Sequence, residues 1–526
     1  MDNPHDDLCK SVSYSVLVNG EPKGMIRPSR GIFQGDPLSR FLFLLCTEGL
    51  HSLISKAANE GSIHGFGLSR RSPKLTHLLF ADDSLLFCRS SRSECQKILQ
   101  ILESDESMSG QKLNRGKTSI FFSKSTIEIV RAEIKEALGM EEIKHYDKYL
   151  GLPSLVERHK KASFDYIKER FWRKLQGWEE KLLSQAGREV LIKAVVQAIP
   201  TYTMCCFKLP LGLCHEIEGL ISKFWWGQRG DRRKIHWVKW EDMCELKSEG
   251  GMGFKELPLF NDALLAKQTW QLLHNKNSLF YRVFKENFFP NCTIMEAKEC
   301  HEGSYAWKSI LKGREVIQRG AKWRVGNGNS MKLWGDKWLP SLTAPSLQGP
   351  LPAELQDATV SSFINPFTRT WDVSILPNVF SQEVSKQIQK IPLSRNTCED
   401  VLTWPFVQTE QYSAKSGYFF LKTEARTYTA PRQQQTDPNK TLWKNIWKLA
   451  LPCKVRNFLW MACRNAIPTK SNLVRRCVIE DSTCSLCSHH QEDVLHALWS
   501  CPSLVQVWDD DPQWNFKNTI RFQLFP

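Results

Sequence analysis

The first quarter of the chain alternates short β-type segments with one long apolar helix. Residues 11–18 (SVSYSVLV) alternate along the strand period, and Asn19 and Gly20 follow as a strong turn signal. Asp36 and Pro37 then make a good helix start, because Asp caps the first turn and Pro suits the first helical position. The helix after them is expected to bury one apolar face, made of Leu38, Phe41, Leu42 and Leu45.

Two apolar runs, residues 78–81 and 85–87, flank Asp82 and Asp83. This pattern predicts two strands joined by a tight turn, with both carboxylates at the tip of the hairpin. Adjacent carboxylates repel each other unless a cation offsets their charge, and phosphoryl transfer uses a pair of Mg²⁺ ions held by such groups. An ordinary turn is the alternative, because Asp is common in turns, so the pair alone is a weak signal.

The rest of the chain divides into regions that differ in composition and in predicted secondary structure. Helical patterns dense in Lys, Arg and Trp follow the hairpin, and a Trp-rich region punctuated by Gly and Pro comes next. A polar stretch with two prolines is typical of a linker, and it precedes a compact C-terminal unit. We therefore expect an α+β fold. The predicted regions are 1–125 (strands and helix), 126–225 (helices), 226–422 (mixed connector), 423–441 (linker), 442–508 (compact unit) and 509–526 (tail).

The balance of charges favours a polyanionic partner. The chain of 526 residues carries 71 Lys and Arg against 56 Asp and Glu, a formal net charge of +15. Nucleic acid is the commonest polyanion, and a solvated basic surface without a partner is the alternative. Residues 1–10 contain three acids and no apolar core, and the longest apolar run, Phe41–Cys46, is too short to cross a bilayer. We therefore expect an intracellular protein, nuclear or cytoplasmic and not secreted, with no membrane partner.

A helical pattern at residues 166–191 interleaves cations with aromatic side chains. Such a face could follow a phosphate backbone. An amphipathic core helix with a solvated face needs no ligand, however, and is the commoner case. The candidate nucleic-acid-binding residues are Arg170, Arg173, Lys174, Lys181 and Arg188.

Three cysteines and one histidine near the C-terminus have the spacing of a zinc site. The first two cysteines form a C-x2-C knuckle, and a short helix over residues 493–500 is expected to present the histidine to it. Three thiolates and one imidazole make a closed tetrahedral set, which is typical of structural Zn²⁺. The predicted ligands are Cys484, Cys487, His496 and Cys501.

Two points about this C-terminal unit stay open. The cysteines could be buried thiols around a core histidine, and His489 and His490 compete for the imidazole position, although they lie very close to Cys487. Residues 444–476 contain eight Lys or Arg and no acid. This basic run suggests binding of RNA or DNA, but zinc modules also dock proteins, and the sequence does not separate the two uses.

The order of these motifs resembles the reverse transcriptases of plant LINE-type (non-LTR) retrotransposons. RGIFQGDPLS (30–39) matches the family's Gly-rich turn, FADD (80–83) its catalytic hairpin, and LNRGKTSIFFS (113–123) the strand that follows. The C-terminal unit is similar to the reverse-transcriptase zinc-binding domain of the same elements. Further matching segments extend the resemblance over most of the chain: 148–161, 177–210, 235–257 and 323–340.

The resemblance implies a partial polymerase palm, followed by a thumb that grips the template–primer duplex. Asp82 and Asp83 would be catalytic ligands of Mg²⁺, and the partners would be an RNA template, a DNA primer and dNTPs. Lys117 would lie near the triphosphate, where its charge offsets that of the leaving pyrophosphate. The remaining implied nucleotide contacts are Gln34 and Gly35, against the nucleotide and the templating pair, and Phe80 and Ala81, along its sugar.

Departures from the family pattern bear on activity. Phe33 and Arg40 stand where the family usually has Arg and Pro. In the family a further metal-binding Asp and the fingers precede the Gly-rich turn, and we expect this chain to start too late to contain them. We therefore expect an RNA-directed DNA polymerase fragment that is impaired or inactive alone. The alternatives are a non-catalytic zinc-dependent relic that binds nucleic acid or protein, and a relic with no biochemical role.

Overall fold

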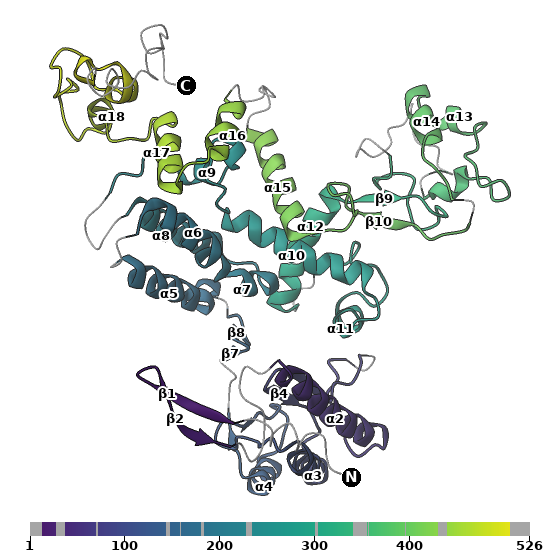
Figure 1. The fold of residues 1–526 in the computed structure, drawn as a ribbon. Helices are drawn as coiled ribbons and strands as arrows, with labels where there is room; N and C mark the ends of the chain where they lie inside the picture. The colour runs from purple at the N-terminus through teal and green to yellow at the C-terminus, as the bar shows by residue number, and fades with distance from the viewer. Residues whose placement is uncertain are drawn as a thin grey trace. The chain divides into compact units, whose positions relative to one another are not determined.

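The computed structural model has an α+β fold (Figure 1). Contacts divide the chain into two units, residues 1–155 with 276–291 (unit 1) and residues 156–275 with 292–526 (unit 2), and each is described by itself. The predictions for Gln34, Gly35 and Lys181 lie outside the described residues. The structure describes residues 13–27, 37–69, 72–143, 148–157, 159–179, 183–227, 234–299, 303–339, 355, 357–394, 396–429 and 439–504.

Unit 1 is built from short two-stranded sheets and three longer helices. Three of the sheets are antiparallel (β1–β2, β3–β4 and β7–β8), and β5 pairs with β6 in parallel. Residues 276–291, with α11 (Leu279–Phe288), group with this unit. Its other elements are β1 (Tyr14–Val18), β2 (Glu21–Ile26), α2 (Ser39–Asn59), β3 (His77–Phe80), β4 (Asp83–Leu86), α3 (Arg92–Ser109), β5 (Ser119–Ile120), α4 (Glu128–Leu138), β6 (Glu141–Glu142), β7 (Lys148–Tyr149) and β8 (Leu152–Pro153).

The predicted buried face of α2 is wrong at its N-terminal end. The helix begins at Ser39, after Leu38 in the capping position, and Phe41 and Leu45 are 65% and 67% exposed. Its buried residues, Ile54 and Ala57, lie near the other end, where α2 packs against α3. Helical spacing identifies an apolar face, but only a neighbouring element can cover it, and none of the described residues covers this end.

Among the described residues, α2 is long and apolar enough to cross a membrane, by length and composition only. Its 21 residues contain an 18-residue window with a mean hydropathy of 1.2, of which 11% is buried. The prediction of no membrane partner considered only the uninterrupted apolar run Phe41–Cys46, whereas a helix tolerates a few polar residues within an apolar span. Length and composition alone do not distinguish a membrane helix from a core helix.

Unit 2 is mainly helical and is organised around α10 (Leu257–His274), which packs against α7, α12 and α15. Apolar residues occur on all sides of α10, as is typical of a helix buried in a core. A single large hydrophobic cluster joins residues from Phe164 to Ala466, and a smaller one joins residues between Val325 and Ile388. The other elements are α5 (Lys160–Glu179), α6 (Gln185–Ala194), η1 (Val196–Ala198), α7 (Thr201–Cys206), α8 (Leu211–Trp226), α9 (Trp240–Met243), η2 (Lys247–Glu249), α12 (Tyr305–Gly320), β9 (Lys322–Arg324), η4 (Val360–Phe363), α13 (Leu376–Val379), α14 (Gln382–Gln389), β10 (Val401–Thr403), α15 (Ala414–Thr429), α16 (Lys440–Lys448), α17 (Cys453–Cys463), α18 (Lys470–Arg475), η5 (His496–Ser500) and η6 (Pro502–Leu504).

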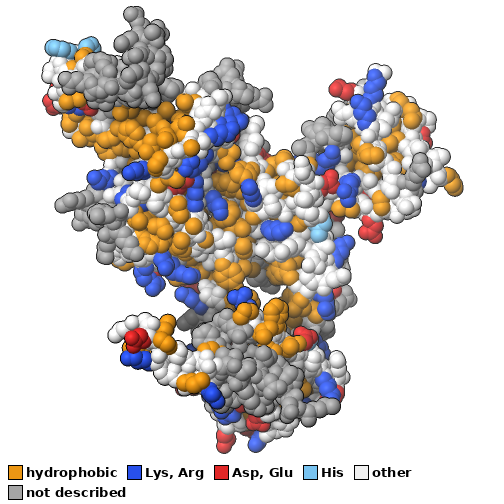
Figure 2. Space-filling model, viewed as in Figure 1, with side chains coloured by type: hydrophobic (Ala, Val, Ile, Leu, Met, Phe, Trp, Pro, Cys, Tyr) orange, Lys and Arg blue, Asp and Glu red, His pale blue; other side chains and the backbone are white. Residues whose placement is uncertain are grey.

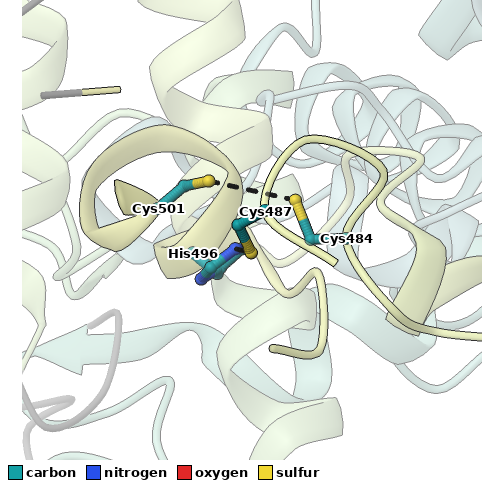
Figure 3. Close-up of side chains that lie close together, drawn as sticks. All are labelled: Cys484, Cys487, His496 and Cys501. Atoms are coloured by element: carbon teal, nitrogen blue, oxygen red, sulfur yellow. Dashed lines mark hydrogen bonds between the residues drawn. The ribbon is translucent and has the colours of Figure 1, made fainter. Parts of the chain in front are cut away.

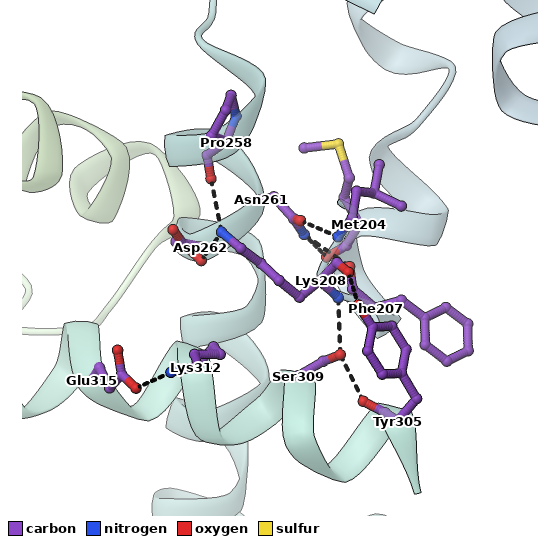
Figure 4. A network of polar contacts seen from close by, with 11 residues as sticks. Met204, Phe207, Lys208, Pro258, Asn261, Asp262, Tyr305, Ser309, Lys312 and Glu315 are labelled. Carbon is purple, nitrogen blue, oxygen red and sulfur yellow. Dashed lines mark hydrogen bonds and ion pairs between the residues drawn. The ribbon is translucent and has the colours of Figure 1, made fainter. Parts of the chain in front are cut away.

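A buried amide on α10 fixes the chain between α7 and α8 (Figure 4). The Asn261 side chain is fully buried, and its oxygen accepts a hydrogen bond from the Leu209 N–H at 2.8 Å. Its nitrogen donates to the Met204 carbonyl at 2.8 Å and to the Phe207 carbonyl at 3.0 Å. One side chain therefore satisfies three backbone groups, two of them in buried hydrogen bonds.

The predicted linker is wrong over residues 423–429, which belong to α15. The Lys422 side chain is buried and donates to the Cys244 carbonyl at 2.5 Å, and Arg426 forms ion pairs with Glu245 and Glu249. Arg426 is thus paired with partners 177 positions or more away along the chain. A composition rule that reads local polarity as solvent exposure could not detect that pairing.

Candidate functional site

The paired aspartates lie at the tip of a β-hairpin, as predicted. β3 and β4 are antiparallel, with His77 opposite Leu86 and Phe80 opposite Asp83. Ala81 and Asp82 form the tight turn between them, and Ala81 has a φ of +48°, in the left-handed region. Asp82 and Asp83 are both exposed, so their carboxylates can reach a cation without burying an unpaired charge.

The strands hold this turn because their apolar side chains face the small core of unit 1. Leu86 packs against the cluster of Ile54, Ala57 and Ile101, and the Phe87 N–H donates to the Thr76 carbonyl at 2.8 Å. The hairpin is therefore anchored at its base and open at its tip. Phe80, at the tip, is 61% exposed.

The other predicted nucleotide contact in the described residues lies in a separate turn. The Lys117 N–H donates to the Asn114 carbonyl at 3.0 Å, and its side chain is exposed. The strand after it, β5, pairs with β6 and not with the hairpin. Over the described ranges, the aspartate pair is not part of a group of three or more clustered metal-ligand side chains.

Such a group does occur at the C-terminus, and it contains the four predicted zinc ligands (Figure 3). Their ligand atoms all lie within 4.8 Å of one another. The Cys484 and Cys501 sulfurs are 3.9 Å apart, and the Cys487 sulfur is 3.3 Å from the His496 Nε2. A zinc tetrahedron with Zn–S bonds of about 2.3 Å has S···S edges of about 3.8 Å, so the donor set fits the ion.

Local hydrogen bonds explain why the knuckle and the helix present their ligands to one point. The Ser488 N–H donates to the Cys484 carbonyl at 2.9 Å, and Ser488 has a φ of +57°, which turns the chain back after Cys487. The Asp493 carboxylate accepts from the His496 N–H at 2.7 Å and so starts the short helix. This cap was not predicted, although the Asp at the start of the helix expected over residues 493–500 was a signal for it.

The electrostatics of the knuckle favour a thiolate. Hydrogen bonding by the backbone N–H of His489, helped by that of His490, lowers the pKa of the Cys487 thiol to about 5. A thiolate is the form of cysteine that binds a metal ion. The His490 ring stacks on the His496 ring, and it is His496 that belongs to the four-residue group.

The candidate nucleic-acid-binding residues differ in their surroundings. Arg170, Arg173 and Lys174 are exposed on α5 around Trp172, which is 53% exposed. The opposite face of α5 is buried, so this helix is amphipathic, with a solvated basic face. The Arg188 guanidinium instead donates to the Trp225 carbonyl at 3.2 Å and lies over the Phe224 ring, so it stabilises the C-terminal end of α8.

The aspartate hairpin and the Cys₃His group each lie in a segment that matches a known protein family. Residues 3–154 match the family model of the reverse transcriptase (RNA-dependent DNA polymerase), and residues 412–508 match that of the zinc-binding region in reverse transcriptase. A putative ribonuclease H protein of Arabidopsis thaliana is 31% identical over 68% of this chain. An uncharacterized mitochondrial protein of the same plant is 40% identical over 27% of this chain and 93% of its own length. The chain belongs to the reverse transcriptases of plant non-LTR retrotransposons.

The residue ranges of the two family matches differ from the predicted regions of this reverse transcriptase. The zinc-binding match begins at residue 412 and not at 442, so it includes α15 and the stretch predicted as a linker. The polymerase match ends at residue 154, after β8, and contains the aspartate hairpin. The chain spans 57% of the length of the ribonuclease H relative.

Proposed function

We propose that this reverse-transcriptase chain acts in RNA-directed DNA synthesis, with Asp82 and Asp83 as ligands of Mg²⁺. The observation that supports this is the exposed hairpin that carries both carboxylates inside the segment matched to the polymerase family. Mg²⁺ held there would activate the attacking oxygen and stabilise the leaving pyrophosphate. The chain's own residues would position the dNTP, through the exposed Phe80 and Ala81 of the hairpin and the charge of Lys117.

The same proposal includes low activity for the chain alone. Two Mg²⁺ ions need more carboxylate ligands than one Asp pair supplies, and no third carboxylate joins the pair among the described residues. Binding of template and primer does not need these ions. We therefore expect the chain to bind a primed RNA template and to extend the primer slowly or not at all.

Primer extension with the purified full chain, Mg²⁺ and dNTPs tests the catalytic part. Little or no product, with the same amount from Asp82→Ala, agrees with the low-activity proposal. Fast synthesis that Asp82→Ala abolishes would contradict low activity and would support the two aspartates as catalytic ligands. Fast synthesis that persists in Asp82→Ala would refute the role of the hairpin.

Template–primer duplex is proposed to lie along the basic face of α5. Removing two phosphate contacts lowers the slope of log affinity against log salt by about 1.8 for duplex. We expect this change for the Arg173→Ala/Lys174→Ala double variant. The matched control is Lys386→Ala/Lys390→Ala, which removes one exposed cation in α14 and one directly after its C-terminal end. If both double variants bind duplex with the same affinity and slope, α5 is not the binding face.

The second candidate function is non-catalytic binding through the zinc-binding region. The observation that favours it is the complete Cys₃His donor set in the described residues. If this second function holds, the Asp82→Ala variant should still bind duplex or a protein partner. Neither the unchanged chain nor any variant should then extend a primer.

A further inference from the structure

The zinc-binding region carries a strip of exposed cations and apolar side chains along α16, α17 and the turn between them. We name this set the α16–α17 strip. Figure 2 shows hydrophobic side chains beside Lys and Arg side chains over this part of the chain. The strip consists of Lys444, Lys448, Leu449, Leu451, Lys454 and Phe458.

Seven of the eight cations in the basic run from residue 444 to 476 fall into two classes in the structure. Four of its cations stabilise the fold by donating hydrogen bonds to backbone carbonyls. These are Arg456 to Trp447, Arg464 to Gly250, Lys470 to Thr483 and Arg476 to His236. The lysines of the strip differ, because Lys444, Lys448 and Lys454 are exposed and form no hydrogen bond or ion pair within the described residues. Their charges are therefore available to a ligand.

The helical geometry places these lysines next to apolar contacts. Lys444 and Lys448 are four positions apart and so lie on one face of α16, about 6 Å from each other along the axis. Lys454 and Phe458 have the same spacing on α17. Phe458 is 40% exposed, and Leu449 and Leu451 are each 42% exposed.

Within the described part of the chain, the helices of the strip carry no negative charge. Residues 439–479 contain no Asp or Glu. The elements packed beneath, α6 and η2, do contain acids, but these are paired. Glu189 binds Lys193 and Lys247, and Glu249 binds Arg426. Of the residues that the structure describes, a polyanion would thus meet cations and apolar side chains along the strip.

We propose that the α16–α17 strip binds single-stranded RNA or DNA. Lysines would contact successive phosphates, and the exposed Phe458 ring would stack on a base. A duplex suits the strip less well, because its bases are already stacked on one another and offer no face to the ring. This goes beyond the proposed duplex contact on α5, because it assigns a second surface and a different form of nucleic acid.

The test is fluorescence anisotropy of the full chain with a labelled RNA single strand of about 12 nucleotides, titrated over a range of salt. Lys448→Ala/Lys454→Ala should lower the slope of log affinity against log salt by about 1.4, which is two contacts at about 0.7 each for single strands. The control Lys386→Ala/Lys390→Ala removes the same charge elsewhere and should leave the slope unchanged.

Phe458→Ala tests the stacking contact separately from charge. This substitution should lower the affinity for the RNA single strand by on the order of 10-fold and leave the affinity for duplex unchanged. Phe367→Ala, at a ring that is 95% exposed, is the matched control and should bind as the unchanged chain does. Equal affinities and slopes for the strip variants and their controls would overturn the proposal. Loss of duplex binding only in Arg173→Ala/Lys174→Ala would support the α5 face independently of this result.

Discussion

The Trp460 indole nitrogen donates a hydrogen bond to the Gly250 carbonyl at 2.8 Å, although 210 positions separate the two residues. The Arg464 Nε donates to the same oxygen at 2.7 Å. Gly250 has a φ of +83°, and a Cβ added to it would lie 2.8 Å from the Trp443 ring. The loop after η2 therefore packs against α16 and α17 through Gly250. The zinc-binding region shares its hydrophobic core with the helices that precede it.

Gly250→Ala is expected to destabilise unit 2 by about 2 kcal/mol or more. About 1 kcal/mol comes from the left-handed backbone, and the rest comes from the contact with the Trp443 ring. Gly335→Ala is the control, since Gly335 has a φ of +90° and open space around its Cβ. Chemical denaturation followed by circular dichroism measures both. An equal loss of unfolding free energy in the two variants would show that the contact between Gly250 and the Trp443 ring contributes nothing beyond backbone strain.

Asn261→Ala should cost about 3 kcal/mol, because it leaves three backbone groups without a partner, two of them buried. The same denaturation experiment measures it. Asn445→Ala, at an exposed position of α16, should change stability by less than about 0.5 kcal/mol. A small effect at Asn261 would mean that water replaces the amide in that pocket.

Local sequence patterns were enough to predict the positions of the two sites, but they did not predict how the surrounding elements pack. The aspartate hairpin and the Cys₃His set depend on neighbouring residues in the sequence, so spacing was enough to place them. The covered face of α2 and the polar end of α15 depend on partners far away in the chain. The pairing of Arg426 with Glu249, for example, joins residues 177 positions apart, and no periodicity in either segment records it.

Stability should depend on pH through Glu218, a buried carboxyl on α8. Burial raises its pKa to about 7, although it accepts a hydrogen bond from the Leu257 N–H at 2.7 Å. Between pH 4.5 and 7 the folded chain keeps a proton that the unfolded chain releases. The free energy of unfolding therefore falls as pH rises through this window, by on the order of 3 kcal/mol.

Glu218→Gln isolates this contribution, because an amide cannot ionise. The variant should be more stable than the unchanged chain above pH 7 and should lose most of the pH dependence between pH 4.5 and 7. Glu383→Gln, at an exposed position of α14, should leave the pH dependence as it is. Denaturant titrations at a series of pH values measure both, and a Glu218→Gln curve parallel to that of the unchanged chain would refute the assignment.

Removal of one zinc ligand should unfold the C-terminal module while the helices around α10 persist. We expect one zinc per chain, and clearly less in Cys487→Ser, because three ligands bind a structural ion far more weakly than four. The loss should appear as rapid proteolysis after residue 470, since few apolar side chains there are buried apart from the ligand cluster. Cys398→Ser, at an exposed cysteine outside the cluster, is the control. Full zinc content and unchanged protease resistance in Cys487→Ser would rule out these four residues as the zinc site.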